Sequence, residues 1–377
     1  MNENKNLLLW VQALRGIAAL MIVMVHARFY LRGETGEFIA QNFFYHGALG
    51  VDLFFMLSGF LMVITTTNCD GSYRYAYEFF CKRVARIWPM YAFSCLLLLV
   101  FSLYFPTFGL PLSEYRKFFE SLFFIPIDPN AQLYFSLPIA VAWTLCFEFY
   151  FYVVFGASLL FGKWRWVALA VWFLVTLVAI PMSTGTFNLS VVDTYRYLDF
   201  RYANLAVNPI VLEFILGMLV GKLYLSETWL PNRYVVGALT VAAAVLVGVL
   251  SATGIANFHG PLGWGGTVFV LFLCIAMLSK VVKLGAPAWL AWLGMISYSL
   301  YVTHLFAFNL LDVVSYMLGW KDGDKPSQWH FWANPIFALV FAAVAFRYVE
   351  NPGSAWLKRV LTTGWSARSS RRQGAAL

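Results

Sequence analysis

Long apolar runs alternate with short polar segments along most of the chain. Ten runs come close to the roughly 20 residues that a helix needs to cross the hydrocarbon core of a membrane: Trp10–Tyr30, Phe43–Ile64, Ile87–Phe105, Leu137–Phe161, Trp164–Pro181, Pro209–Leu225, Val235–Leu250, Leu262–Ser279, Ile296–Leu318 and Phe331–Tyr348. Because backbone in lipid must satisfy its own hydrogen bonds, these runs predict transmembrane helices. We therefore predict an all-α polytopic membrane protein with about ten transmembrane helices over residues 1–352. Residues 353–377 are polar and basic, and we expect a disordered cytoplasmic tail there.

Composition agrees with this pattern and excludes most other classes of protein. Of the 377 residues, 61% are hydrophobic and 12% are charged, about half of the usual charged share of ~25%. So few charges cannot cover a soluble protein of this length, and they do not fit a disordered, collagen-like or coiled-coil chain. The five cysteines show no CxxC-like spacing, so we expect neither a metal ion nor a disulfide framework.

The net charge of +8 is interpreted as a topology signal, not as a nucleic-acid-binding surface. If the N-terminus is cytoplasmic and ten spans alternate, 18 of the 26 Lys and Arg residues face the cytoplasm and eight face the other side. This bias predicts that both termini are cytoplasmic. The first apolar run contains Arg15 and His26 and has no small-residue cleavage site, so we expect a membrane helix there and no cleaved signal peptide.

Ionisable side chains within the apolar runs are the main functional candidates, because each is costly to place in a membrane. The runs contain Arg15, His26, Asp52, Glu148, Glu213 and His304, and Arg83 and Arg86 lie where the third span begins. Eleven helical steps separate Arg15 from His26, which is about three turns plus ~20°, so both lie on one face about 16 Å apart. A long anionic substrate could enter past Arg15 and place its reactive end near His26. Alternatively, Arg15 snorkels to the interface and His26 only packs against a neighbour.

The other charged candidates have both functional and structural interpretations. Arg83 and Arg86, at positions i and i+3, suit the binding of phosphates, although ordinary positive-inside charge would explain them as well. Asp52 could orient a histidine, or it could be a carboxylate at a helix start near the interface. An unpaired charge such as Glu148 costs about 2.5–3.5 kcal/mol at the membrane centre, so Glu148 predicts a partner or a water-filled cavity.

Two further candidates are more ambiguous. Glu213 could belong to a site or be a structural carboxylate. His304 lies in the stretch SYSLYVTH, which begins with Ser297 and Tyr298, and it could be a second active-site imidazole or a buried hydrogen-bonded one.

Several motifs, taken together, identify a family. They are LRGIAALMIVMVHA with its Arg-x10-His spacing, GVDLFFMLSGFL, Arg83-x-x-Arg86, WTLCFEFYFY, SYSLYVTH and the terminal YVENP. In this order, and from Leu14 to Pro352, they resemble the acyltransferase-3 family of integral membrane O-acyltransferases. Some members add a C-terminal periplasmic hydrolase-like domain; this chain ends too soon for one, so we expect a stand-alone member.

The resemblance implies transfer of an acyl group, commonly acetyl, from cytosolic acyl-CoA to a hydroxyl group of a cell-surface or exported glycan at the inner membrane. Acyl-CoA would be a co-substrate, and no permanently bound cofactor is expected. By position, Arg15 and His26 match the family's essential first-helix pair, and Arg83 and Arg86 match its second basic pair. Asn351 stands where many members carry Lys, which weakens any role for that position.

We therefore assign candidate roles as follows: His26, Asp52 and Glu148 are catalytic; Arg15, Arg83 and Arg86 bind acyl-CoA; His304, Ser297, Tyr298 and Glu213 are secondary. His26 could act as a general base or carry the acyl group covalently. A secondary transporter or flippase for a polar or glycan-linked solute is the main alternative, and a membrane sensor or assembly subunit is a second one. Membrane lipid surrounds the protein in each case. The residues do not encode the oligomeric state.

The charge bias leads to a topology test. Reporter fusions after Asn204 and Lys325 should read as external, and fusions after Lys163 and Lys283 should read as cytoplasmic, because Lys and Arg are retained inside. Enzymatic reporters active on only one side of the membrane make this measurement. A fusion at Leu377 that reads as external would require an odd number of spans and contradict the prediction.

Overall fold

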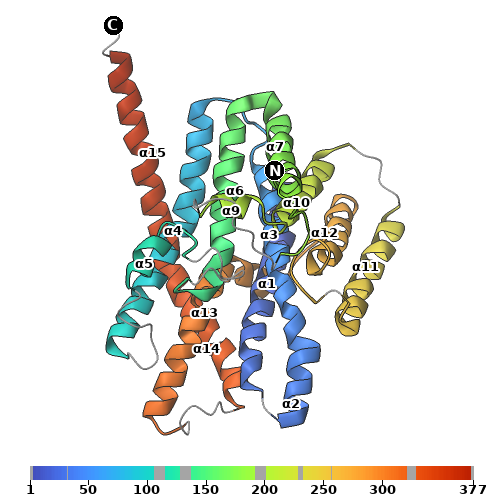
Figure 1. Ribbon diagram of the computed structural model, residues 1–377, viewed down its shortest axis with the longest axis vertical. Helices are drawn as coiled ribbons and strands as arrows, with labels where there is room; N and C mark the ends of the chain where they lie inside the picture. Colours follow the sequence, from blue (N-terminus) through green and yellow to red (C-terminus); the bar gives the residue numbers. More distant parts are fainter. Residues whose placement is uncertain are drawn as a thin grey trace.

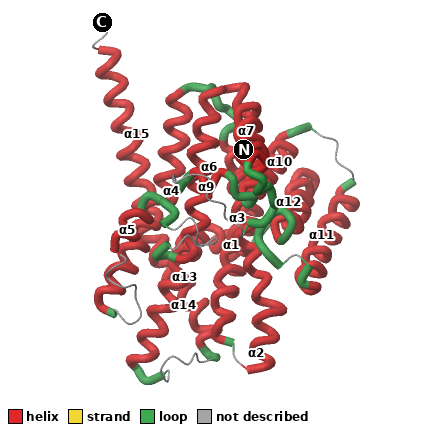
Figure 2. Tube along the Cα trace, in the orientation of Figure 1, coloured by secondary structure: helices red, strands yellow, loops and turns green. Residues whose placement is uncertain are grey.

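The computed structural model describes residues 3–31, 33–105, 115–127, 137–191, 201–227, 232–255, 257–320 and 328–374. Within these ranges every regular element is a helix, and no strand is present (Figures 1 and 2). The α-helices are α1 (Glu3–Ala27), α2 (Gly33–Ile39), α3 (Leu49–Thr65), α4 (Tyr73–Tyr104), α5 (Tyr115–Ser121), α6 (Trp143–Ser158), α7 (Arg165–Leu174), α8 (Ile180–Ser183), α9 (Ala203–Ala206), α10 (Val211–Leu225), α11 (Arg233–Thr253), α12 (Trp264–Val281), α13 (Ala288–Met317), α14 (His330–Ala345) and α15 (Asn351–Gly374).

Eight helical segments in the described ranges are long and apolar enough to cross a membrane. The all-α, multi-pass prediction is thereby confirmed. One segment, Ala140–Ser183, contains two of the predicted spans. These two are separated at Gly162, where φ is 52° and the chain turns from α6 into α7. The predicted span Pro209–Leu225 corresponds to α10, which has 15 residues.

Close helix packing at glycines builds the centre of the bundle. A Cβ atom on Gly294 of α13 would overlap the carbonyl oxygen of Gln12 on α1, and one on Gly16 would lie 2.9 Å from the Gly294 nitrogen. A Cβ on Gly217 of α10 would likewise overlap the carbonyl oxygen of Met56 on α3. Small residues let membrane helices approach backbone to backbone. The pairs α1–α13 and α3–α10 are therefore held in close contact.

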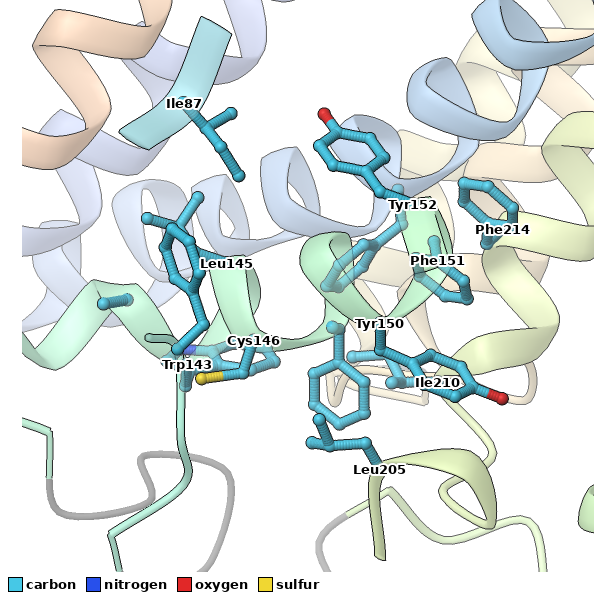
Figure 3. Packing of buried hydrophobic residues seen from close by; sticks show 14 of the residues in the cluster. Ile87, Trp143, Leu145, Cys146, Tyr150, Phe151, Tyr152, Leu205, Ile210 and Phe214 are labelled. Carbon is cyan, nitrogen blue, oxygen red and sulfur yellow. The ribbon is translucent and has the colours of Figure 1, made fainter. Parts of the chain in front are cut away.

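Aromatic side chains surround α6. Phe151 stacks on Phe214 of α10, with ring centroids 3.8 Å apart and an interplanar angle of 5°. Figure 3 shows Tyr150 and Tyr152 pointing to different sides of this helix. Leu145 and Tyr152 of α6 and Ile87 of α4 line one cavity, which is described below. This aromatic packing sets the rotation of α6 about its axis, so that Leu145 and Tyr152 face the cavity.

The C-terminal segment differs from the sequence expectation. The π-helix Phe346–Glu350 (η8) follows α14, and α15 then runs alongside α4 and away from the bundle (Figure 1). Helix therefore extends to Gly374, over most of the segment for which the sequence predicts a disordered tail. The Tyr77 hydroxyl of α4 donates a hydrogen bond to the Leu361 carbonyl at 3.1 Å. Contacts with α4 order the start of this helix.

Replacement of Gly217 by Ala should destabilise the bundle, because the new methyl group meets the rigid backbone of Met56. Overpacking of this kind typically costs about 1–3 kcal/mol. Thermal unfolding of the detergent-purified protein measures the effect. Gly248→Ala on α11 is the matched control, since nothing lies within 4 Å of a Cβ at that position. Equal melting temperatures for the two variants would contradict the packing of α3 on α10.

Candidate active site

Three arginines and one carboxylate surround a narrow cavity within the bundle. Its volume is about 70 Å³, and side chains from α1, α3, α4, α6 and α13 line it. Arg15, Arg83, Arg86 and Glu148, which lie far apart in the sequence, are all in its wall. Ser297 and Tyr298 line it as well. The structure thus brings six of the predicted site residues together.

Hydrogen bonds hold two of the basic side chains in place. Arg15 is largely buried, with 9% of the residue's surface exposed, and its guanidinium donates to the Ser297 hydroxyl at 3.1 Å. Arg83 donates to the Thr65 hydroxyl at 3.0 Å. Its guanidinium carbon also lies 5.7 Å from the ring centroid of Tyr152, within the range of a cation–π contact. The wall of the cavity is therefore basic and held by neighbouring polar groups.

Glu148 has the partners that its place in an apolar span requires. Its Oε1 atom accepts hydrogen bonds from the Ser58 hydroxyl at 3.2 Å and from the Tyr152 hydroxyl. The prediction of a partner or a cavity for Glu148 is confirmed, because both are present. The sequence analysis includes neither Ser58 nor Tyr152 among the candidate site residues. The i, i+4 spacing of Glu148 and Tyr152 was the available signal.

His26 and His304 form a second group, on α1 and α13. The Nδ1 atom of His26 lies 3.1 Å from Nε2 of His304 and 2.9 Å from the Ile22 carbonyl oxygen. Nδ1 of His304 lies 2.8 Å from the Tyr301 carbonyl oxygen. A nitrogen facing a carbonyl must carry the proton, so both neutral rings are protonated on Nδ1. His304 then accepts from His26, and Nε2 of His26 keeps its lone pair for chemistry.

Tyr301 connects the imidazole pair with the cavity. Its side chain lines the cavity, and its hydroxyl lies 2.8 Å from that of Thr144. Its backbone carbonyl is the acceptor for His304, three residues later on the same helix. Neither histidine is among the described residues that line the cavity, and Tyr301 connects the cavity wall to His304. Arg15 and His26 lie on one face of α1, about 16 Å apart along the helix.

Asp52 lies at the start of α3 and faces a histidine, as one of its two sequence interpretations predicts, but this histidine is His259 and not His26. Its Oδ2 atom lies 2.8 Å from Nδ1 of His259, and its Oδ1 accepts from the Gly260 amide at 3.2 Å. Glu213, fully buried, lies beside Asp52 in the same group. This contact forms because the loop after α11 folds back onto the start of α3 and places His259 beside Asp52.

Sequence reasoning passed over His259 because it lies in a predicted loop. The available signal was its setting in HGPLGWGG, since glycines allow backbone to approach a buried side chain. Gly265 does so here: a Cβ atom at this position would lie 2.5 Å from Oε1 of Glu213. Across the described part of the chain, no group of three or more His, Cys, Asp or Glu side chains is arranged to hold a metal ion.

Comparison with known proteins places this geometry in context. The family model described as "Acyltransferase domain" matches residues 8–347. The chain is 30% identical to the exopolysaccharide production protein ExoZ of Rhizobium meliloti, over 72% of this chain and 80% of that protein. It is 23% identical to the peptidoglycan O-acetyltransferase OatA of Listeria monocytogenes, over 91% of this chain and 55% of that protein. No solved structure matches the chain significantly.

The pairing of Asp52 with His259 can be tested by a double-mutant cycle. Asp52→Ala and His259→Ala should each lower stability by about 1–3 kcal/mol, since the first leaves the Gly260 amide and the partly buried His259 without their acceptor and the second leaves the buried Asp52 without a partner. The double variant should lose less than the sum of the two. Thermal unfolding in detergent measures all three, with Glu34→Ala on the exposed face of α2 as control. Additive losses would contradict a direct interaction between the two side chains.

Proposed function

This chain belongs to the acyltransferase-3 family of integral membrane O-acyltransferases, and we propose that its donor is cytosolic acyl-CoA, that the transferred group is acetyl, and that it works in the cell inner membrane. Family membership favours acyl transfer over the transporter alternative. The observation that carries the proposal is a cavity lined by Arg15, Arg83 and Arg86, whose wall residue Tyr301 contacts the His26–His304 pair through His304.

The proposed acceptor is a hydroxyl group of a cell-surface or exported glycan. The support comes from the relatives: one is named for exopolysaccharide production and another for O-acetylation of peptidoglycan. Both names point to polymers built of sugars, whose hydroxyl groups are natural acceptors.

The three arginines are proposed to bind the donor. Guanidinium groups bind phosphate oxygens through paired, charge-assisted hydrogen bonds. With the phosphates held near the arginines, the thioester arm would pass along α1 toward His26. Glu148 would keep the arginine side chains oriented through the network that it forms with Ser58 and Tyr152.

At the far end, His26 is proposed to act as the general base. Its Nε2 atom would accept the proton of the acceptor hydroxyl as the hydroxyl oxygen attacks the thioester carbonyl. Collapse of the tetrahedral intermediate forms the ester and breaks the carbon–sulfur bond, and the imidazolium returns the proton to the departing thiolate. His304 is a positioning residue in this scheme, because its Nε2 atom accepts from Nδ1 of His26 and stabilises the protonated ring.

Replacement of His26 should lower turnover strongly and should leave donor binding largely unchanged. General base catalysis typically contributes ~10²–10⁴-fold, so His26→Gln should lose activity on this scale while it still binds CoA. Acetylation of the glycan in membranes, normalised to inserted protein, measures turnover, and titration with CoA measures binding. His46 follows α2 in the chain and serves as the control. The variant His46→Gln should behave like the wild type.

Two outcomes separate the proposed roles. Arg15→Ala should raise the KM for the donor more than it lowers turnover, because Arg15 lies about 16 Å from His26 along the helix. Activity of His26→Gln close to that of the wild type would show that the ring is structural. The general base would then have to be sought elsewhere.

A further inference from the structure

A second, larger cavity opens at the end of the bundle where α1, α4, α13 and α15 meet. Its volume is about 640 Å³. Five basic side chains line it, namely Arg15, Lys82, Arg86, Lys358 and Arg359, together with one acid among the described lining residues, Glu350. Arg15 and Arg86 also line the narrow cavity described above, so the two cavities adjoin at these side chains. A large basic chamber thus adjoins the narrow cavity at Arg15 and Arg86.

One face of α15 supplies six of the fifteen described residues that line this chamber. The lining residues from this helix are Asn351, Ser354, Ala355, Lys358, Arg359 and Thr362. Their spacing of three and four residues places them on a single helical face. This face is polar and basic although it points toward the protein. The opposite side is apolar and exposed, with Trp356 at 60% and Val360 at 48% of their surface accessible. Trp356 and Val360 lie within the candidate membrane span His330–Thr363, so their side of α15 can face lipid while the polar side faces the chamber.

The opposing wall comes from α4, and close contacts hold the two helices together. Lys82, Ala85 and Arg86 line the chamber from one face of α4. A Cβ atom on Gly353 would lie 3.0 Å from Cβ of Pro89, so α15 approaches α4 closely there. The hydrogen bond from Tyr77 to the Leu361 carbonyl fixes a second point. Lys358 and Arg359 lie between these two contacts along the helix.

The basic side chains that line the chamber outnumber the acids near it. Glu350 accepts from the Ser299 amide at 3.1 Å and from the Ser299 hydroxyl at 2.5 Å, and its charge also interacts with Arg15 and Arg86. Lys82 reaches Glu78 at 3.6 Å, an exposed pair on one helix that contributes little. A ligand with several negative charges would therefore be favoured.

We propose that α15 is part of the donor site: Lys358 and Arg359, with Lys82, bind the phosphates at the nucleotide end of the acyl donor. This inference rests on the proposed function and extends it to a helix outside the predicted site. The donor's phosphate monoester carries about −1.5 to −2 charge, and its diphosphate bridge adds more. A bulky nucleotide fits the large chamber, and the slender thioester arm fits the narrow passage beyond Arg15 and Arg86.

The test compares full-length variants in detergent and in nanodiscs. The variant Lys358→Ala/Arg359→Ala should raise the KM for acetyl-CoA by roughly ten- to a hundredfold. Its turnover at saturating donor should stay close to that of the wild type, since His26 and His304 are untouched. Adenosine 3′,5′-bisphosphate, which lacks the thioester arm, should inhibit the wild type and inhibit the double variant much less. The charge-preserving variant Lys358→Arg/Arg359→Lys should retain most donor affinity.

The matched control removes two lysines from the same predicted side of the membrane. Lys163 and Lys283 are exposed and do not line either cavity. Lys163→Ala/Lys283→Ala should leave the donor KM unchanged apart from weak long-range screening effects. If the α15 double variant and this control have the same donor KM, the role of α15 is wrong while the proposed acyl transfer stands. If the wild type binds neither CoA nor acetyl-CoA, both proposals are wrong.

Phospholipid headgroups also carry phosphate, so a separate binding experiment distinguishes a nucleotide site from a lipid-headgroup site. Binding of adenosine 3′,5′-bisphosphate is measured in nanodiscs of phosphatidylcholine, with and without phosphatidylglycerol. Unchanged affinity supports the nucleotide assignment. If phosphatidylglycerol abolishes binding to the wild type, the chamber is a lipid-headgroup site and the assignment is overturned.

Discussion

A polar side chain within an apolar helix bundle must find its partners inside the bundle, because lipid offers none. This constraint acts most clearly between α1 and α13. Arg15 donates to Ser297, His26 pairs with His304, and Tyr30 donates to Asp312 at 2.8 Å. From the first pair to the third, the residue number increases in both segments, so the two segments run parallel. Each contact removes the cost of a buried polar group, and together they set the register of the two helices.

Close backbone approach makes these contacts possible. Gly16 and Gly294 bring α1 and α13 together near Arg15, and Gly59 and Gly217 do the same for α3 and α10. Membrane helices gain little from the hydrophobic effect when they associate, so packing at small residues contributes much of the attraction. The polar groups then add specificity, because a shift along the helix axis would separate every pair. Stability and site geometry are therefore coupled in this bundle.

The polar residues divide into groups with different surroundings. The arginines and Glu148 face a cavity, where water or a ligand can solvate charge. The histidine pair lies just beyond it and is satisfied by backbone carbonyls. Asp52 and Glu213 are fully buried and form a compact cluster with the partly buried His259, whose ring centroid lies 5.7 Å from that of Trp143. The first two groups lie on one path suited to a long, anionic substrate, and the third stabilises the packing of a loop onto α3.

Apolar run length and charge content determined the helical membrane fold from the sequence alone, because the requirement for internal hydrogen bonds in lipid is local to each segment. Helical periodicity also placed Arg15 and His26 on one face of α1. Only the tertiary structure decided which helices meet. Asp52 pairs with His259, not with His26, since a loop more than 200 residues away folds onto α3. In the sequence, Lys358 and Arg359 belong to the predicted basic tail. They line a chamber only because α15 packs against α4. Contacts between distant segments depend on how whole helices pack, and no local pattern of residues specifies that.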